Sequence, residues 1–169
     1  EAIQIIRGIW DTDQRGGVRI EGEYYQVKGA KRGPRPAHEI SIWLGAYKPR
    51  ILRLTGRLAD GWIPSLGYLK GGPADLKTMN AYIDEGAEQA GRDPSAIRRM
   101  LNINGEFSRV SRGLLNGPPE QWAEELAGIS LEYGTTGFIL AAHDELTIDL
   151  YAKEVAPAAR ELVEAELAR

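Results

Sequence analysis

Residues 40–65 of the chain read ISIWLGAYKPRILRLTGRLADGWIPS, and this stretch decides the fold. The apolar run Ile40–Leu44 is typical of a parallel strand that is covered on both faces. Gly45 and Ala46 follow as small residues that allow close approach of the backbone to a ligand. Pro49 suits the first position of a helix, where its missing N–H costs nothing. The stretch therefore predicts a strand, a tight turn, a helix over 49–59 and a second strand over 61–64.

The turn between this strand and this helix has the features of an anion site. The first amides of a helix lack partners within the helix, and its dipole favours negative charge there. Lys48 and Arg50 add two cations beside these amides. The turn therefore predicts a phosphate or anion site, and an ordinary strand–helix connection is the alternative.

Strands and helices alternate along the rest of the chain. We expect a helix over 1–11, an insertion loop over 12–39 that contains a small hairpin, and four βα units over 40–169. The later strands are expected at 99–107 and 137–142, and the last helix is expected to break near Pro157. This alternation predicts an α/β fold with a parallel sheet. Four βα units are half of a (β/α)8 TIM barrel, and the alternative is an open flavodoxin-like sheet.

Two helices show a clear apolar face at helical spacing. One runs through Leu76, Met79 and Ile83 and ends at Gly91, and the other contains Leu126 and Ile129. Residues three and four positions apart share one face of a helix. We therefore expect these five side chains to be buried against the sheet.

Several short motifs together resemble one known family. They are Ile42–Ala46, Pro49–Arg50, Gly56–Arg57, Ala59–Trp62 and Pro64, with weaker matches at 21–25, 33–36 and 90–94. This set is similar to the bacterial-luciferase-like family of flavin-dependent oxidoreductases and monooxygenases. The resemblance implies that the chain is the C-terminal half of a (β/α)8 barrel, and that the N-terminal half is absent from this sequence.

The same resemblance implies a cofactor and a set of residues that bind it. The cofactor would be FMN or, as the alternative, the 5-deazaflavin coenzyme, with its phosphate at the turn and its ring beside the next strand. The implied cofactor-binding residues are Gly45, Ala46, Tyr47, Lys48, Arg50, Trp62, Pro64 and Ser65. The family's usual acid and base residues belong to the first four strands, so the sequence names no catalytic residue.

Two further polar residues follow strands at the end where a barrel builds its active site. Asn104 lies toward the carboxyl end of the strand over 99–107 and shares one face of it with Asn102, and His143 follows the last strand directly. Either residue could contact the substrate, since an amide can bond a ligand edge and a histidine can act as acid, base or anion partner. The alternatives are that Asn104 bonds backbone groups and that His143 is a solvated loop residue.

Composition excludes several classes of protein. The 169 residues are 43% hydrophobic and 27% charged, with a formal net charge of −3, which argues against partners such as nucleic acid and anionic membranes. The chain has no cysteine and two histidines that are far apart, so it offers no disulfide and no metal spacing. No run reaches the ~20 apolar residues of a membrane span. We therefore expect a cytoplasmic protein.

The expected function is a part of a flavin-dependent oxidoreductase that supplies the cofactor phosphate site. Its expected partners are the cofactor, a small organic substrate, and either the N-terminal half of the barrel or a second copy of the chain. This chain alone is expected to be inactive. Two alternatives are a non-catalytic binding module that pairs with itself, and another TIM-barrel enzyme whose phosphorylated substrate uses the same turn.

Overall fold

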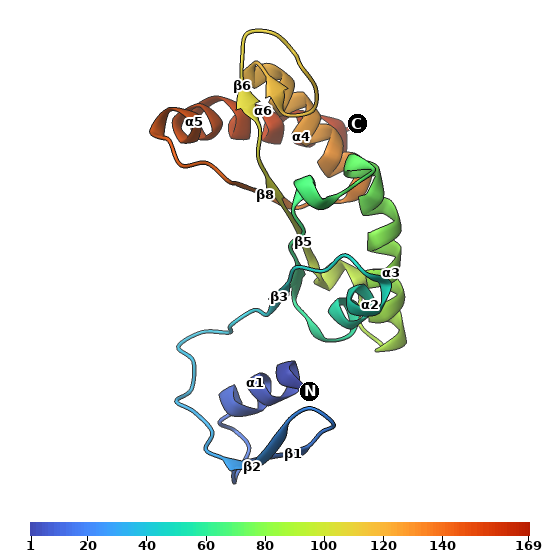
Figure 1. Cartoon of the computed structure of the whole chain (residues 1–169), viewed down its shortest axis with the longest axis vertical. Coiled ribbons are helices and arrows are strands. Elements are labelled where there is room, and N and C mark those ends of the chain that lie inside the picture. Colours follow the sequence, from blue (N-terminus) through green and yellow to red (C-terminus); the bar gives the residue numbers. More distant parts are fainter. The chain divides into compact units, whose positions relative to one another are not determined.

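The computed structural model describes all residues from 1 to 169, and the chain divides into two compact units (Figure 1). The first unit comprises Glu1–Ile42 and the second comprises Trp43–Arg169. The boundary lies close to residue 40, where the sequence predicts that the βα units begin. No helix in the structure combines the length and the hydrophobicity that a membrane crossing requires.

The first unit is a helix with a small hairpin. Helix α1 (Ala2–Trp10) precedes strands β1 (Val18–Glu21) and β2 (Gln26–Ala30), which pair antiparallel and confirm the predicted hairpin. The carboxylate of Glu1 accepts hydrogen bonds from the backbone N–H groups of Glu23, Tyr24 and Tyr25. These three bonds fix the start of α1 to the hairpin turn.

The second unit contains a four-stranded, all-parallel sheet with strands in the order β3-β4-β5-β8. Its strands are β3 (Trp43–Leu44), β4 (Gly61–Trp62), β5 (Arg98–Ile103) and β8 (Gly137–Leu140). The helices that follow them are α2 (Pro49–Leu58), α3 (Asp75–Gln89), α4 (Pro119–Tyr133), and α5 (Glu145–Leu150) with α6 (Ala156–Leu167). The predicted α/β class with a parallel sheet is therefore confirmed, and a helix follows each of its four strands.

The strand order bears on the choice between the two predicted architectures. Neighbouring strands follow one another along the chain, and right-handed crossovers then place all helices on the same face of the sheet. A flavodoxin-like sheet instead reverses its strand order and carries helices on both faces. The order is that of a barrel, but the sheet is open, with β3 at one edge and β8 at the other. The half-barrel therefore stays an interpretation.

The predicted strand Ile40–Leu44 is longer and more buried than the observed one. Only Trp43 and Leu44 pair with β4, both are half-buried, and Ile40 is 43% exposed. The physical reason is that β3 lies at the edge of the sheet, so it has a partner on one side only. An apolar run indicates that a strand packs against a core, but it does not indicate whether the strand has a neighbour on both sides.

The predicted strand over 99–107 is two strands in the structure. After β5 the chain passes Asn104 and Gly105 and then forms β6 (Glu106–Phe107), which pairs with β7 (Asn116–Gly117). A Cβ atom on Gly105 would lie 1.9 Å from the carbonyl oxygen of Leu115. The chain therefore leaves the main sheet at Gly105 because the backbone of the following loop packs directly against it.

The core lies between the sheet and the helices, as the helical patterns predict. Leu76, Ile83, Leu126 and Ile129 are at most 4% exposed, and Met79 is half-buried against the same core. Helices α2 and α3 cross in close contact. A Cβ on Gly56 would lie 1.9 Å from the carbonyl oxygen of Ile83, so glycine is required for this crossing. The core predictions are confirmed.

The last helix is irregular before Pro157, as the sequence predicts. A π-helical turn, η4 (Tyr151–Val155), joins α5 to α6, and the N–H of Ala156 bonds the carbonyl of Tyr151. Proline has no N–H and its ring crowds the carbonyl four residues earlier, so a regular α-helical turn cannot continue through Pro157. A π turn accommodates one residue more than an α-helical turn, so the helix can continue past this point.

Candidate functional site

The turn between β3 and α2 leaves several hydrogen-bond donors open. Lys48 caps α2, and its carbonyl accepts the N–H groups of Ile51 and Leu52, each at 3.0 Å. The amides of Tyr47, Lys48 and Arg50 bond no group within the chain, as the first turn of a helix predicts. The side chains of Lys48 and Arg50 are exposed and form no ion pair. Free amides and two unpaired cations therefore occur together in this turn.

Gly45 is not demanded by the fold of the chain. A Cβ at this position would meet only the carbonyl oxygen of Ile63, at 3.5 Å, which is an ordinary van der Waals contact. Gly45 is also exposed and is not among the glycines with positive φ. Neither backbone strain nor crowding inside the chain explains the missing side chain. Close approach by a group outside the chain would explain it.

Tyr47 links this turn to the end of the neighbouring strand. Its hydroxyl oxygen accepts the backbone N–H of Ser65 at 2.8 Å, so the proton of the hydroxyl is left with no acceptor within the chain. The side-chain amide of Asn102 donates to the hydroxyl of Ser65 at 3.3 Å. The structure thus joins the carboxyl ends of β3, β4 and β5 through the side chains of Tyr47, Ser65 and Asn102.

Trp62 and Pro64 support the turn from inside the core. The indole of Trp62 is 1% exposed, and its Nε1–H donates to the carbonyl of Ala46 at 2.9 Å. Ala46 is itself 3% exposed. Pro64 is buried, and its carbonyl accepts the N–H of Asn102. These contacts hold the backbone of the turn in place, and direct contact of Trp62, Pro64 or Ala46 with a cofactor stays a prediction.

The two predicted substrate residues occupy different surroundings. Asn104 is exposed directly after β5, and a Cβ on Gly67 would lie 4.0 Å from its side-chain oxygen, so it belongs to the same group of strand ends. His143 is exposed in the loop before α5 and forms no hydrogen bond or ion pair within the chain. Its neighbour Asp144 caps α5 by accepting the N–H of Thr147 at 2.8 Å.

Two members of this group are not among the predicted site residues, although the sequence places Asn102 on the same strand face as Asn104. The ring of Tyr68 packs edge-on against Tyr47 with ring centroids 5.7 Å apart, and Tyr68 is 75% exposed. Asn102 carries the hydrogen bond to Ser65 described above. The signal for Asn102 was its alternation with the buried Leu101 and Ile103. No sequence signal placed Tyr68 against Tyr47, since they are far apart in the chain.

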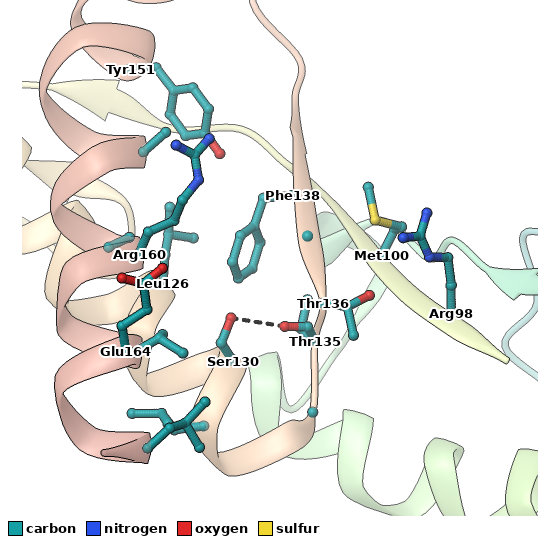
Figure 2. Close-up of a pocket in the computed structure, with 17 residues that line it drawn as sticks. Arg98, Met100, Leu126, Ser130, Thr135, Thr136, Phe138, Tyr151, Arg160 and Glu164 are labelled. Atoms are coloured by element: carbon teal, nitrogen blue, oxygen red, sulfur yellow. Dashed lines mark hydrogen bonds between the residues drawn. The ribbon is translucent and has the colours of Figure 1, made fainter. Parts of the chain in front are cut away.

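A groove of about 740 Å³ lies elsewhere, along β8 between α4 and α6 (Figure 2). Phe138 points into it, and Tyr151 and Arg160 face it from the last helix (Figure 2). The hydroxyl of Ser130 donates a hydrogen bond to the carbonyl of Thr135 at 2.8 Å. The groove also reaches Arg98 and Gly137, at the amino ends of β5 and β8, whereas α/β folds bind ligands at the carboxyl ends. It is therefore separate from the candidate site.

No group of three or more histidine or acidic side chains in the structure is placed to hold a metal ion. The candidate site therefore consists of free backbone amides, hydroxyls, carboxamides and cations. Such donors fit a ligand that carries oxygen acceptors and negative charge.

Comparison with known proteins identifies relatives of this chain. The chain is 37% identical to an F420-dependent glucose-6-phosphate dehydrogenase of Gordonia bronchialis over 103 residues, which are 61% of this chain and 29% of the relative. The corresponding enzyme of Mycolicibacterium gilvum is 35% identical over the same length. The match thus spans less than a third of these relatives.

Solved structures show the same fold at lower identity. An F420-dependent secondary alcohol dehydrogenase, solved with an F420-acetone adduct, matches with a TM-score of 0.78 and 20% identity. The match covers 94% of this chain and 60% of that one. A long-chain alkane monooxygenase matches with a TM-score of 0.64 and 15% identity, over 89% of this chain and 48% of that one.

The family comparison covers the part of the chain that contains the turn. The model of the luciferase-like monooxygenases matches residues 1–105, which include Gly45, Tyr47, Ser65 and Asn104. This match extends over more than half of the sequence and confirms the resemblance drawn from the motifs. The chain belongs to the luciferase-like monooxygenase family.

Proposed function

We propose that this chain is part of an oxidoreductase that transfers hydride with the deazaflavin coenzyme F420, and that FMN is the alternative cofactor. The observation that supports this proposal is the open turn at Gly45–Arg50 within a member of this family. The relatives named above are described as F420-dependent, which favours the deazaflavin. Neighbouring folds include monooxygenases, which keeps FMN as the alternative.

The residues of the turn fit a phosphate-bearing cofactor. The space beside Gly45 is free of the chain's own atoms apart from the carbonyl of Ile63, and the amides of Tyr47, Lys48 and Arg50 are unpaired. Amides at a helix start are suited to a phosphate group, and the nearby cations strengthen that preference. We assign Gly45, Ala46, Tyr47, Lys48 and Arg50 to the phosphate. We assign Trp62, Pro64 and Ser65 to the flank of the cofactor.

The protein's contribution in this proposal is binding and orientation. A bound deazaflavin or flavin supplies the hydride acceptor or donor. The hydroxyl of Tyr47 has a proton to donate, and the bond from Ser65 holds that hydroxyl in position. Asn104 and His143 lie after strands β5 and β8, where they could contact the substrate. No side chain of this chain is assigned a proton-transfer step.

The proposal extends to the architecture. Four parallel strands in chain order with two open edges suit the C-terminal half of a (β/α)8 barrel, completed by an N-terminal half or by a second copy of the chain. Family membership favours this reading over the two alternatives. Those alternatives are a barrel enzyme that binds a substrate phosphate at the same turn, and a binding module without catalysis.

The test is a titration of the protein with F420, FMN and riboflavin, in which the fluorescence of each compound reports its binding. Riboflavin shares the ring of FMN but lacks the phosphate. We expect F420 or FMN to bind in the micromolar range or tighter, and riboflavin to bind at least roughly tenfold more weakly, because one charge-assisted contact is missing. If neither F420 nor FMN binds, the proposed function is wrong. Equal affinity for FMN and riboflavin would remove the phosphate assignment.

A further inference from the structure

Two of the asparagines in the chain are followed directly by glycine. These pairs are Asn104–Gly105, which follows β5, and Asn116–Gly117, which forms β7. An asparagine before glycine can lose its amide group, because glycine has no side chain to shield its backbone nitrogen from the asparagine side chain. The two pairs are equal in sequence, so their surroundings in the fold decide which of them reacts.

The fold protects the second pair. The side-chain amide of Asn116 donates to the carbonyl of Leu114 at 2.8 Å, and its backbone N–H donates to the carbonyl of Gly113 at 3.0 Å. Gly117 is buried and pairs with Phe107 in the ladder that joins β6 and β7. The side chain of Asn116 can therefore reach the nitrogen of Gly117 only after these contacts open locally.

The first pair lies outside the regular structure. Asn104 and Gly105 are exposed and belong to no strand, since they separate β5 from β6 (Figure 1). The side chain of Asn104 bonds no group of the chain, and neither does the backbone N–H of Gly105. The two reacting groups, which are the side-chain amide and the nitrogen that attacks it, are therefore free of competing contacts.

Close packing at residue 105 prevents replacement of this glycine. A Cβ atom there would lie 1.9 Å from the carbonyl oxygen of Leu115 and 2.7 Å from the ring of Trp122. A bulkier residue after Asn104 would slow the loss of its amide, but the packing of the following loop excludes such a residue. The structure thus requires the reactive sequence at this position.

We propose that Asn104 is a site of spontaneous deamidation in the folded protein, and that Asn116 is protected from it. The nitrogen of Gly105 attacks the side-chain carbonyl carbon of Asn104, so that a bond between these two atoms forms and the bond to the amide nitrogen breaks. The amide nitrogen leaves as ammonia with the proton of the attacking N–H. Water then opens the cyclic imide at either carbonyl group and leaves aspartate or isoaspartate. No oxidant or reductant is consumed.

The reaction changes the charge of the candidate site. It places a carboxylate at the strand ends, where hydrogen bonds join Tyr47, Ser65 and Asn102 and where Asn104 also lies. Isoaspartate also lengthens the backbone next to the tightly packed Gly105. Both products disfavour a ligand that carries negative charge. This consequence, unlike the modification itself, rests on the proposed function.

The experiment incubates the full chain at mildly alkaline pH and follows both asparagines by mass spectrometry of proteolytic peptides. We expect Asn104 to be converted to a mixture of aspartate and isoaspartate. Asn116 should react at least about tenfold more slowly, because its surroundings must first open. The same chain unfolded in urea is the control, and there the two pairs should react at similar rates.

Three results would overturn the proposal. They are equal rates for the two pairs in the folded chain, faster reaction of Asn116, and an unmodified Asn104 under conditions in which the unfolded chain reacts. Asn104→Gln checks the chemistry, because the longer side chain disfavours the cyclic imide while the amide is kept. Release of ammonia by the folded protein should fall to the level of the remaining asparagines. Release at the original rate would also contradict the proposal.

Two further variants test the consequence for the site. Asn104→Asp reproduces the charge of one product, and Asn104→Ser removes the amide without adding charge. At low salt we expect Asn104→Asp to bind F420 or FMN at least about twofold more weakly than Asn104→Ser. Equal affinities would show that the consequence is wrong. If no form of the protein binds either cofactor, the proposed function fails, whereas the peptide measurements still decide whether Asn104 deamidates.

Discussion

The hydroxyl of Tyr47 accepts the backbone N–H of Ser65 at 2.8 Å, and this single bond connects the turn after β3 to the end of β4. The donor is a backbone amide, so the direction of the bond is fixed. The phenolic proton of Tyr47 is therefore free for a ligand, while its oxygen is committed to the protein. A substitution of Tyr47 is therefore expected to affect both the stability of the protein and ligand binding, and each effect has its own measurement.

The variant Tyr47→Phe tests this link. It leaves the half-buried N–H of Ser65 without its partner, and we expect a loss of about 1–3 kcal/mol in the free energy of unfolding. Urea unfolding monitored by fluorescence measures this loss. Tyr68→Phe is the control, because the hydroxyl of Tyr68 is exposed and bonds no group of the chain; its effect should stay within about 0.5 kcal/mol. Similar results for both variants would contradict the role of the bond.

The variant Gly45→Val tests the cofactor turn. The Cβ of the new side chain would meet only an ordinary contact with the carbonyl of Ile63, so we expect stability to change little. Cofactor binding should weaken by about 1–3 kcal/mol, the range for losing one well-placed charged contact. Paired measurements of thermal unfolding and cofactor affinity check both expectations. A stable variant with unchanged affinity would show that the ligand does not approach Gly45.

Two glycine-to-alanine changes in helices should have opposite signs. Gly56→Ala places its Cβ against the carbonyl of Ile83, and we expect the protein to lose about 1–3 kcal/mol from overpacking. Gly128→Ala, on the exposed face of α4, has no atom within 4 Å of the new Cβ and should gain about 0.5–1 kcal/mol. Chemical denaturation of the two variants measures this contrast. A gain at Gly56 would mean that α2 and α3 pack less closely than the structure shows.

The stability of the first turn of α5 should decrease at acidic pH, because Asp144 caps this helix. The backbone N–H of Thr147 bonds the carboxylate and lowers the pKa of Asp144 below its usual value. A carboxyl group with a depressed folded pKa stabilises the folded state above its unfolded pKa, and this contribution is lost as the pH falls through the folded pKa. Protection of the Thr147 amide against hydrogen exchange, measured relative to its intrinsic rate, should fall below about pH 4, near the unfolded pKa of aspartate. In Asp144→Ala, exchange should be fast already at neutral pH, and its pH profile should follow the intrinsic rate.

The helices and the parallel sheet could be predicted from sequence because their signals are local and repetitive. Leu76, Ile83 and Leu126 follow one helical face, and the structure buries all three. Gly91 and Gly134 adopt positive φ just after α3 and α4, as expected of helix stops. Periodicity and end residues are properties of short segments, so they do not depend on how distant parts of the chain meet.

The candidate site could be predicted only in part, because its contacts join distant segments. The sequence indicates the turn at Gly45–Arg50, but the bonds Tyr47–Ser65 and Asn102–Ser65 depend on the spatial order of three strands. The sequence likewise did not show that β3 lies at the edge of the sheet. It did not show that Trp62 is buried either, since an apolar side chain can face a core or a ligand. The roles of the predicted site residues in cofactor and substrate binding remain predictions.

The π turn at Tyr151–Val155 contains one residue more than a regular α-helix would need at the same place. Because the turn accommodates this residue as a bulge, the faces of the helix before and after it stay aligned. Removing one residue from the turn would therefore restore regular α-helical geometry and leave Ala159, now 8% exposed, facing the core. Removing a residue within α6 ahead of Ala159 would instead rotate the residues after it by about 100°. The joint thus tolerates a change of length that the helix following it does not.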